Sequence, residues 1–229
     1  MKIVVISDLH SNFDALEALP EFGDELWVLG DLVNYGPSPS EVVSFVRSHS
    51  KTVVRGNHDH AVGFDVDPRC TPRYADMADS TMQFSKVKLD SDATTFLREL
   101  PLNRIMERDD RRFYLCHAIP SNPLYGYCPE YSDLWARELE QVDANFLLVG
   151  HTHTPFIRKI GDKTIVNPGS LGQPKTGKAD ACYAVWEDGQ FHLKQFAYPV
   201  EKAVQRIEQM PLSTAIKRDL VTVLRTGSV

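Results

Sequence analysis

Five of the eight histidines fall into a pattern with aspartate and asparagine that suits metal binding or proton transfer. Asp8-x-His10 and His151-x-His153 each place two such side chains two residues apart. In an extended chain, residues i and i+2 lie on one face, about 6–7 Å apart at their Cα atoms. Asp8 and His10 can therefore hold one ion, whereas His151 and His153 can reach two neighbouring ions. The remaining candidates are Asp31, the stretch Asn57-His58-Asp59, and His117.

Each piece also has an ordinary explanation. Gly30-Asp31 and Gly56-Asn57 are common turn chemistry, and a lone His117 would fit a hydrogen-bonded core histidine. A His-x-His pair also occurs as polar residues of a loop. The joint pattern is more informative, because all five pieces directly follow strand-like runs, whereas the other histidines, His49, His60 and His192, do not.

The apolar runs that precede these residues predict the strands that position them. They cover residues 3–6, 25–29, 52–54, 113–116 and 145–149. Asn12 can cap a helix over 14–19, and Ser38-Pro39-Ser40-Glu41 has the form of a capping box that opens the next helix. Strands alternating with helices indicate a parallel sheet. In such sheets the carboxyl ends of the strands meet, so the five termini can converge on one site. Carboxylate, imidazole and amide oxygen together suit Mn, Fe, Zn or Ni.

The rest of the chain is predicted as further elements of the same domain, spanning residues 1–229, because no repeat or linker interrupts it. Two C-terminal helices within 200–226 are expected to pack on it through a stripe of leucine and isoleucine. The other expected elements are a loop near 65–72, helices at 73–86, 92–100 and 132–140, a hairpin over 102–116, strands at 155–160 and 163–166, and a hairpin over 181–198.

Composition limits the class of partner. The net charge is −6, which argues against a sequence-independent grip on duplex nucleic acid. No apolar run approaches the ~18 residues of a membrane span, and the apolar start is too short for a signal peptide, so a cytoplasmic location is expected. The four cysteines form no Cys-x-x-Cys pair, so neither a zinc ribbon nor a thioredoxin-like site is predicted. Disulfides are not expected in a chain without a secretory signal. Whether copies of the chain form a homo-oligomer is left open.

Taken in order, the blocks Asp8-x-His10, Gly30-Asp31, Gly56-Asn57-His58-Asp59, His117 and Gly150-His151-x-His153 resemble the calcineurin-like metallophosphoesterase superfamily. The stretch 167–174, Asn-Pro-Gly-Ser-Leu-Gly-Gln-Pro, further resembles its small bacterial and archaeal phosphodiesterase branch. One departure is Ala118, where that branch often has glycine, which puts the loop beside the metals in doubt. The resemblance implies an α/β (α+β) fold, a four-layer αββα sandwich, and a centre of two metal ions.

The resemblance also implies roles for individual residues. Asp8, His10, Asp31 and His153 would hold the first metal. Asp31, Asn57, His117 and His151 would hold the second, with Asp31 bridging.

Beyond the ligands, a metal-bridging hydroxide would attack the phosphorus of a small phosphoester, and His58 would protonate the leaving group while Asp59 positions its ring. Gly169 and Ser170 would present backbone N–H groups to the phosphate, and Lys175 would add charge, although a solvated surface lysine fits equally well.

Three functions remain open. The favoured one is phosphodiester hydrolysis. Within enzymes, the alternative is a phosphomonoesterase or a dinucleoside polyphosphate hydrolase. In another class, the chain would be a non-catalytic metal-binding scaffold, since the superfamily includes a retromer subunit that binds proteins through this fold. That subunit lacks the motif histidine, so the presence of His58 favours an enzyme.

Overall fold

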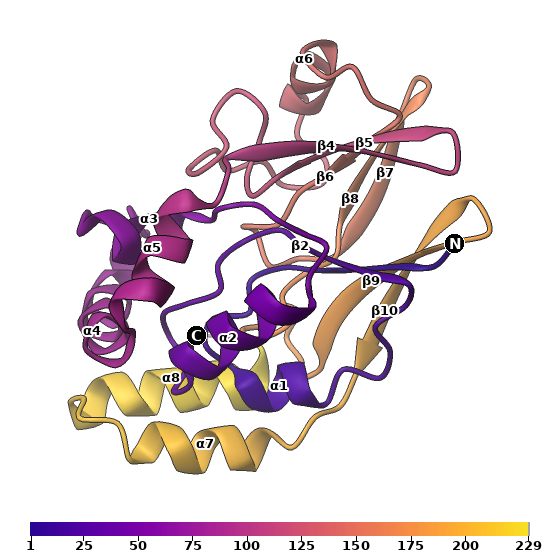
Figure 1. Cartoon of the computed structure of the whole chain (residues 1–229). Coiled ribbons are helices and arrows are strands. Elements are labelled where there is room, and N and C mark those ends of the chain that lie inside the picture. Colours follow the sequence, from indigo (N-terminus) through magenta and orange to yellow (C-terminus); the bar gives the residue numbers. More distant parts are fainter. Residues whose placement is uncertain (229) are drawn as a thin grey trace.

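Two five-stranded sheets face each other, and helices cover both outer faces, in the computed structural model of residues 1–228 (Figure 1). The first sheet has the order β10-β9-β1-β2-β3 and the second the order β4-β5-β6-β8-β7. The predicted four-layer αββα architecture is therefore confirmed. Among the described residues, no helix combines the length and the apolar character needed to cross a membrane.

The first sheet is built on the predicted alternation of strands and helices. β1, β2 and β3 are parallel, joined through α1 and α2, and β9 runs antiparallel to β1. The elements are β1 (Ile3–Ile6), α1 (Phe13–Glu17), β2 (Glu25–Val28), α2 (Pro39–His49), β3 (Thr52–Val53), β9 (Ala181–Glu187) and β10 (Gln190–Phe196).

In the second sheet, β5, β6 and β8 are parallel, so their carboxyl ends also point the same way. Its strands are β4 (Asn103–Arg108), β5 (Arg111–Cys116), β6 (Phe146–Leu148), β7 (Phe156–Ile160) and β8 (Lys163–Asn167). The β4–β5 hairpin turns at Asp109-Asp110, as predicted, and both residues adopt positive φ, which a two-residue turn of this hand requires.

The remaining helices lie outside the sheets. α7 and α8 lie next to α1, α6 lies on the second sheet, and α3, α4 and α5 form a group at one side (Figure 1). Their bounds are α3 (Asn57–Phe64), α4 (Pro72–Lys88), α5 (Ser91–Glu99), α6 (Leu134–Glu140), α7 (Val200–Glu208) and α8 (Thr214–Thr226).

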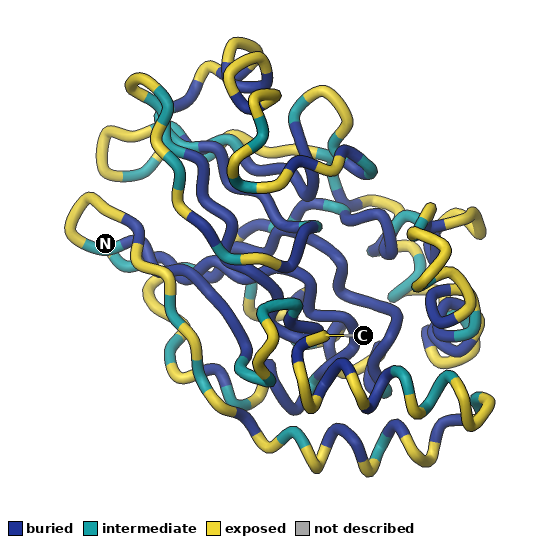
Figure 2. Tube along the Cα trace, turned by 180° about the vertical axis from the view of Figure 1, so that it is seen from behind, coloured by how far each residue is buried: buried dark blue, intermediate teal, exposed yellow. Residues whose placement is uncertain are grey.

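Side-chain alternation along the strands separates the cores. Val5 and Trp27 point between the sheets, whereas Val4 and Val28 point to the helices on the outer face. The layer between the sheets is aromatic, with Phe113 packed edge-to-face on Trp27 at a ring distance of 5.3 Å. The central strands β1, β2 and β9 are buried along most of their length, and Figure 2 shows a buried interior surrounded by exposed loops and helix faces. Both faces of β1 are thus covered, as its unbroken apolar run predicts.

Two local predictions differ from the structure. Ser38 precedes α2, but its side chain does not cap the helix; its hydroxyl instead accepts a hydrogen bond from Arg206 of α7 at 3.1 Å. The stretch that begins at Asn57 is the first turn of α3 rather than a free turn, with Gly56 as its N-cap. A strand-to-helix junction fixes the backbone of Asn57, His58 and Asp59 more firmly than a loop would.

Candidate metal centre

The five predicted blocks converge at the carboxyl ends of strands from both sheets. Residues after β1 and β2 are joined by backbone hydrogen bonds, such as the His10 N–H to the Asp31 carbonyl at 2.9 Å. In the second sheet, the Gly150 N–H after β6 donates to the His117 carbonyl after β5 at 2.7 Å, and across the sheets the His151 N–H donates to Asp8 Oδ2 at 3.1 Å. The ligand loops are therefore tied to one another through their main chains. Except for the partly exposed His151, all the predicted metal ligands are buried.

One cluster comprises Asp8, His10 and His153. The Nε2 atoms of the two histidines lie 3.2 Å apart, and Asp8 Oδ1 lies 3.3 Å from His153 Nε2. Asp8 Oδ1 is buried without a hydrogen-bond partner. Buried carboxylate oxygens are rarely left unpaired, so this arrangement fits a cation between the three groups.

A second cluster comprises Asp31, His117 and His151, with Asn57 beside them. His117 Nε2 lies 3.2 Å from both Asp31 Oδ2 and Asn57 Oδ1, and 3.3 Å from His151 Nδ1. Asp31 Oδ2 also lies 3.8 Å from His10 Nε2 in the first cluster. Asp31 is therefore the carboxylate that lies between the two clusters.

Backbone carbonyls set the tautomer of three histidines. The Nδ1–H groups of His10, His117 and His153 donate to the carbonyls of Val33, Leu29 and Gln173 at 3.1, 2.8 and 2.6 Å. Each ring then directs the lone pair of Nε2 into the centre, which is how ligating histidines are usually oriented. The donor set therefore fits metal ions without rearrangement.

The charge of the centre also favours cations. Burial alone would lower the pKa of His117, but the Asp31 and Asp8 carboxylates raise it to about 9. Burial would raise the pKa of Asp31, yet His117 and His58 hold it well below its usual range. Two buried carboxylates thus attract positive charge, here a proton on His117.

The ligand loops depend on unusual backbone geometry. Five of the seven predicted metal ligands adopt positive φ, a backbone conformation that residues other than glycine rarely take. They are Asp8, His10, Asp31, His151 and His153. Glycine allows the loops to meet closely, since a Cβ on Gly56 would lie 2.7 Å from Asp31 Cγ. Strain of this kind concentrates at functional sites.

The predicted role of Asp59 is wrong. Its carboxylate does not contact the His58 ring but accepts backbone hydrogen bonds from Asp31 and Leu32, both at 2.8 Å, and from Gly56 at 3.0 Å. Asp59 therefore braces the two loops after β2 and β3. Burial and the nearby Asp31 carboxylate raise its pKa to about 7.

Asn34 holds the His58 ring instead. Its Nδ2 donates to His58 Nδ1 at 2.8 Å, so the neutral ring carries its proton on Nε2. Burial lowers the pKa of His58 to about 4, although Asp31 opposes this. His58 Nε2 lies 3.6 Å from the Cys70 thiol, at the wall of a cleft above the metal centre.

Of the three residues expected to contact phosphate, Gly169 and Ser170 lie behind the Asp8 loop, and Lys175 lines the cleft. The Gly169 N–H donates to Asn167 Oδ1 at 2.8 Å, and the buried Ser170 hydroxyl donates to the Asp8 carbonyl at 2.7 Å. This turn supports the Asp8 loop from behind, the Gly169 N–H is already paired, and neither residue lines the cleft described above. That Gly169 and Ser170 contact phosphate stays a prediction. Lys175, in contrast, lines the cleft above the centre, and its Nζ lies 4.7 Å from the Tyr74 ring centroid.

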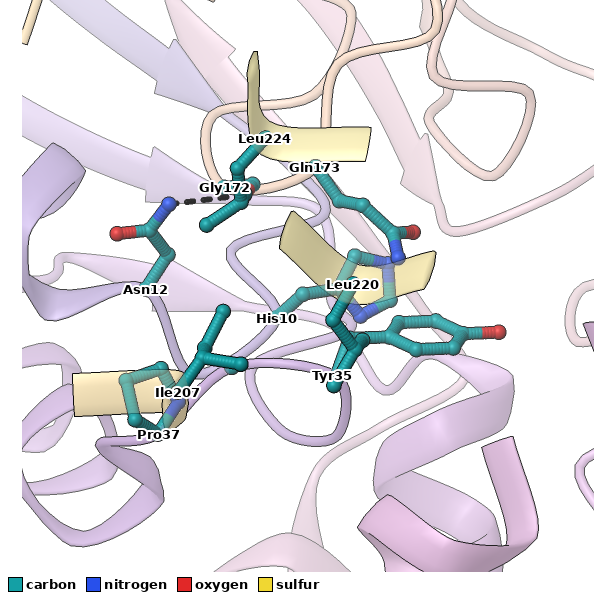
Figure 3. A pocket seen from close by; sticks show the side chains of 10 residues that line it. His10, Asn12, Tyr35, Pro37, Gly172, Gln173, Ile207, Leu220 and Leu224 are labelled. Atoms are coloured by element: carbon teal, nitrogen blue, oxygen red, sulfur yellow. Dashed lines mark hydrogen bonds between the residues drawn. The ribbon is translucent and has the colours of Figure 1, made fainter. Parts of the chain in front are cut away.

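A small cavity of about 10 Å³ lies beside His10 (Figure 3). The side chains of Leu220 and Leu224 from α8 line it together with Tyr35 and Gln173. The Gln173 side-chain amide is buried there without a partner. The last helix therefore packs directly behind a predicted ligand of the first cluster.

Several residues of the site were not predicted from the sequence. They line the cleft, which has a volume of about 310 Å³, or support His58: Asn34, Tyr35, Arg69, Cys70, Tyr74, Tyr125 and Tyr127. Asn34 carries a weak signal, since it follows Gly30-Asp31 in a segment of turn-forming residues. Tyr74 falls in the predicted helix over 73–86, but no motif there indicates a site, and the others lie outside the predicted helices and strands. The place of all these residues beside the predicted ligands therefore depends on tertiary packing.

Comparison with known proteins defines the class. Residues 1–188 match the family described as the calcineurin-like phosphoesterase superfamily domain. The chain belongs to this superfamily, whose phosphoesterases typically bind divalent metal ions.

Three relatives illustrate the likeness. An uncharacterised protein of Methanocaldococcus jannaschii is 30% identical over 231 residues, covering 90% of this chain and 91% of that protein. The crystal structure of a metallophosphoesterase from Sphaerobacter thermophilus matches with a TM-score of 0.84 and 27% identity, covering 99% of each chain. A symmetrical bis(5′-nucleosyl)-tetraphosphatase of Vibrio campbellii is 33% identical over 127 residues, which is 52% of this chain but only 44% of that enzyme.

Proposed function

We propose that the protein is a binuclear metal-dependent phosphoesterase that hydrolyses phosphodiesters. Asp8, His10, Asp31 and His153 would hold one ion, and Asp31, Asn57, His117 and His151 the other. The observation that carries the proposal is the convergence of Nε2 lone pairs on two carboxylates, with Asp31 between the clusters. The donor set suits Mn, Fe, Zn or Ni. Such ions lower the pKa of water and neutralise the charge of a phosphoryl group.

The protein's own contribution to the reaction is the placement of His58. Its Nδ1 accepts from Asn34, so Nε2–H points toward the cleft in which the ester binds. A phosphoester anion beside the ring favours the imidazolium form, in which Nδ1 also carries a proton. The Asn34 amide would then turn so that its Oδ1, which is otherwise buried without a partner, accepts from Nδ1, and Nε2 would give its proton to the leaving oxygen. One P–O bond breaks, and water supplies the hydroxyl that remains on phosphorus. Lys175 would hold a phosphoryl oxygen at the cleft wall.

The preference for diesters rests on the resemblance of residues 167–174. A second candidate, hydrolysis of dinucleoside polyphosphates, is favoured by the similarity to the bis(5′-nucleosyl)-tetraphosphatase of Vibrio campbellii. A scaffold role remains the alternative of another class.

Two esters that differ in their leaving group test the proposal. Bis(p-nitrophenyl) phosphate releases a good leaving group, whereas a dialkyl phosphate needs a proton from the enzyme. We expect His58→Ala to lower turnover of the dialkyl ester about 10²- to 10⁴-fold, with a smaller effect on the nitrophenyl ester and unchanged metal content. His60→Ala, two residues along α3, is the matched control. Equal turnover in His58→Ala and the control would exclude His58 as the proton donor.

Hydrolysis by protein that is shown to carry metal decides between the enzyme and the scaffold. We expect two equivalents of manganese per chain by elemental analysis, lost on substitution of Asp31. Protein that carries metal but hydrolyses neither diesters nor monoesters would favour the scaffold.

A further inference from the structure

The cleft above the metal centre has walls of an unusual composition. Four of the predicted ligands line it, together with four tyrosines and two basic side chains. Tyr35 is buried against His10 and His58, and the others are Tyr74, Tyr125, Tyr127, Arg69 and Lys175. These five residues come from the segment between α3 and α4, the start of α4, the loop after β5, and the turn after β8. Four segments distant in sequence therefore place aromatic and cationic groups around one opening.

Tyr127 differs from Tyr74 and Tyr125 in its exposure. Its side chain is 66% exposed, although its ring lies 6.3 Å from that of the metal ligand His151. Tyr74 and Tyr125 instead pack against cations, with Lys175 Nζ at 4.7 Å and the Arg69 guanidinium at 4.5 Å from their ring centroids. An exposed aromatic face beside a metal ligand contributes little to stability, but it can stack on a flat ring of a substrate.

The segment that carries Arg69 is anchored to a predicted metal ligand. Asn57 Nδ2 donates to the Pro68 carbonyl at 2.9 Å, which leaves its Oδ1 directed at His117 and anchors the segment that carries Arg69. Apart from the ligand Asp31, no residue that lines this cleft within the described chain is acidic. The cleft therefore attracts anions larger than a single phosphoryl group.

A nucleotide combines these features: a flat base, and phosphates on either side of the bond that breaks. A cleft of about 310 Å³ is within the range that binds small organic ligands. A dialkyl phosphate would leave Tyr127 without a partner.

We infer that the phosphoesterase acts on nucleotidyl phosphoesters, with Tyr127 as the platform on which the base stacks, and with Arg69 and Lys175 contacting phosphate oxygens beyond the scissile group. This inference rests on the proposed function for its chemistry and adds the substrate class. Tyr127 determines specificity and takes no part in bond breaking.

Two substrates with one leaving group isolate the contribution of the base. Thymidine 5′-(p-nitrophenyl phosphate) and methyl p-nitrophenyl phosphate both release p-nitrophenol, so their ratio of kcat/KM reports only the nucleoside. We expect a preference of about tenfold or more for the nucleotidyl ester, as base–aromatic stacking supplies elsewhere. Tyr127→Ala should lower the preference at least about fivefold, whereas Tyr127→Phe should keep it.

Tyr131, which is 81% exposed and does not line the cleft, is the matched control. Its replacement by alanine should leave the preference unchanged. A wild-type preference below twofold, or equal loss of both activities in Tyr127→Ala, would overturn the inference.

Binding separates failure of the inference from failure of the proposed function. In calorimetric titrations of the manganese-loaded protein, AMP should bind about tenfold more tightly than inorganic phosphate, and Tyr127→Ala should remove the difference. Arg69→Gln should remove any further gain from ADP over AMP. Equal affinities for AMP and phosphate would overturn the inference whether or not the esters are hydrolysed. Tight AMP binding without hydrolysis would refute only the proposed function.

Discussion

Gly56→Ala should disable the metal centre through the collision of one methyl group with the Asp31 carboxylate. The new Cβ would overlap both Asp31 Oδ1 and the Asp31 backbone nitrogen, and it would lie 2.7 Å from Asp31 Cγ, about 0.7 Å inside the ordinary contact distance of 3.4 Å. Asp31 cannot swing away freely, because its Oδ1 accepts the His58 N–H at 2.9 Å and its backbone N–H is held by Asp59.

The expected loss follows from that displacement. Overpacking of this size costs about 1–3 kcal/mol of stability. A displacement approaching 1 Å at a reacting centre can lower the rate about 10²-fold. We therefore expect a folded protein that hydrolyses bis(p-nitrophenyl) phosphate roughly 100-fold more slowly and retains less than two equivalents of metal by elemental analysis.

Gly63→Ala is the matched control in the same helix, α3. Its Cβ would lie 3.2 Å from the flexible Arg98 side chain, and alanine is favoured over glycine inside a helix by about 0.5–1 kcal/mol. This variant should keep full activity and melt at or slightly above the wild-type temperature. Wild-type metal content and turnover in Gly56→Ala would show that the Asp31 carboxylate is not confined as described.

Three further outcomes follow from single contacts. Asn34→Ala should slow hydrolysis of the dialkyl ester in the wild-type background but should not lower the rate further in a His58→Ala background. A double-mutant cycle in which the two substitutions lower the rate independently would contradict this expectation. Iodoacetamide should modify Cys70, which lines the cleft, and block turnover without loss of metal. The reaction should be faster at high pH, because burial raises the pKa of the thiol. Cys70→Ser should resist the reagent, and inhibition of this variant would show that another residue is modified. Glu21→Gln should lower the free energy of unfolding by about 1 kcal/mol at pH 7 after allowance for solvent screening. Hydrogen bonds from Lys194 and Lys2 lower the Glu21 pKa from 4.5 to about 2, so the urea midpoints of the two proteins should converge as the pH falls through that interval.

The five motifs that carry the predicted metal ligands could be recognised because each directly follows an apolar run. Local pattern gives the strand, and the rule that parallel strands share a carboxyl edge brings Asp8 and Asp31 together in the first sheet, and His117 and His151 together in the second. The short spacing of His151 and His153 then places one of them in each cluster. That the two edges meet depends on how the sheets pack, which the strand pattern alone does not show.

The support of His58 could not be predicted for the opposite reason. Asp59 is adjacent in sequence, and adjacency suggested that it orients the ring. Because Asn57 begins α3, His58 and Asp59 point in different directions from consecutive positions of a helix, and Asp59 faces the backbone of Leu32. The residue that does hold the ring, Asn34, is 24 positions away. The position of Tyr127 could not be predicted for the same reason, because only the tertiary fold places its loop beside His151.

The backbone of the metal ligands implies a trade between stability and activity. Five of the predicted ligands occupy positive φ, where a non-glycine residue costs on the order of 1 kcal/mol. Glycine at His10 or His153 would relieve that cost, so such variants should be easier to fold without metal than the wild type. A selection for expression or heat resistance alone would therefore tend to erase the centre, and stabilising this enzyme by consensus or directed evolution requires metal and turnover in the screen.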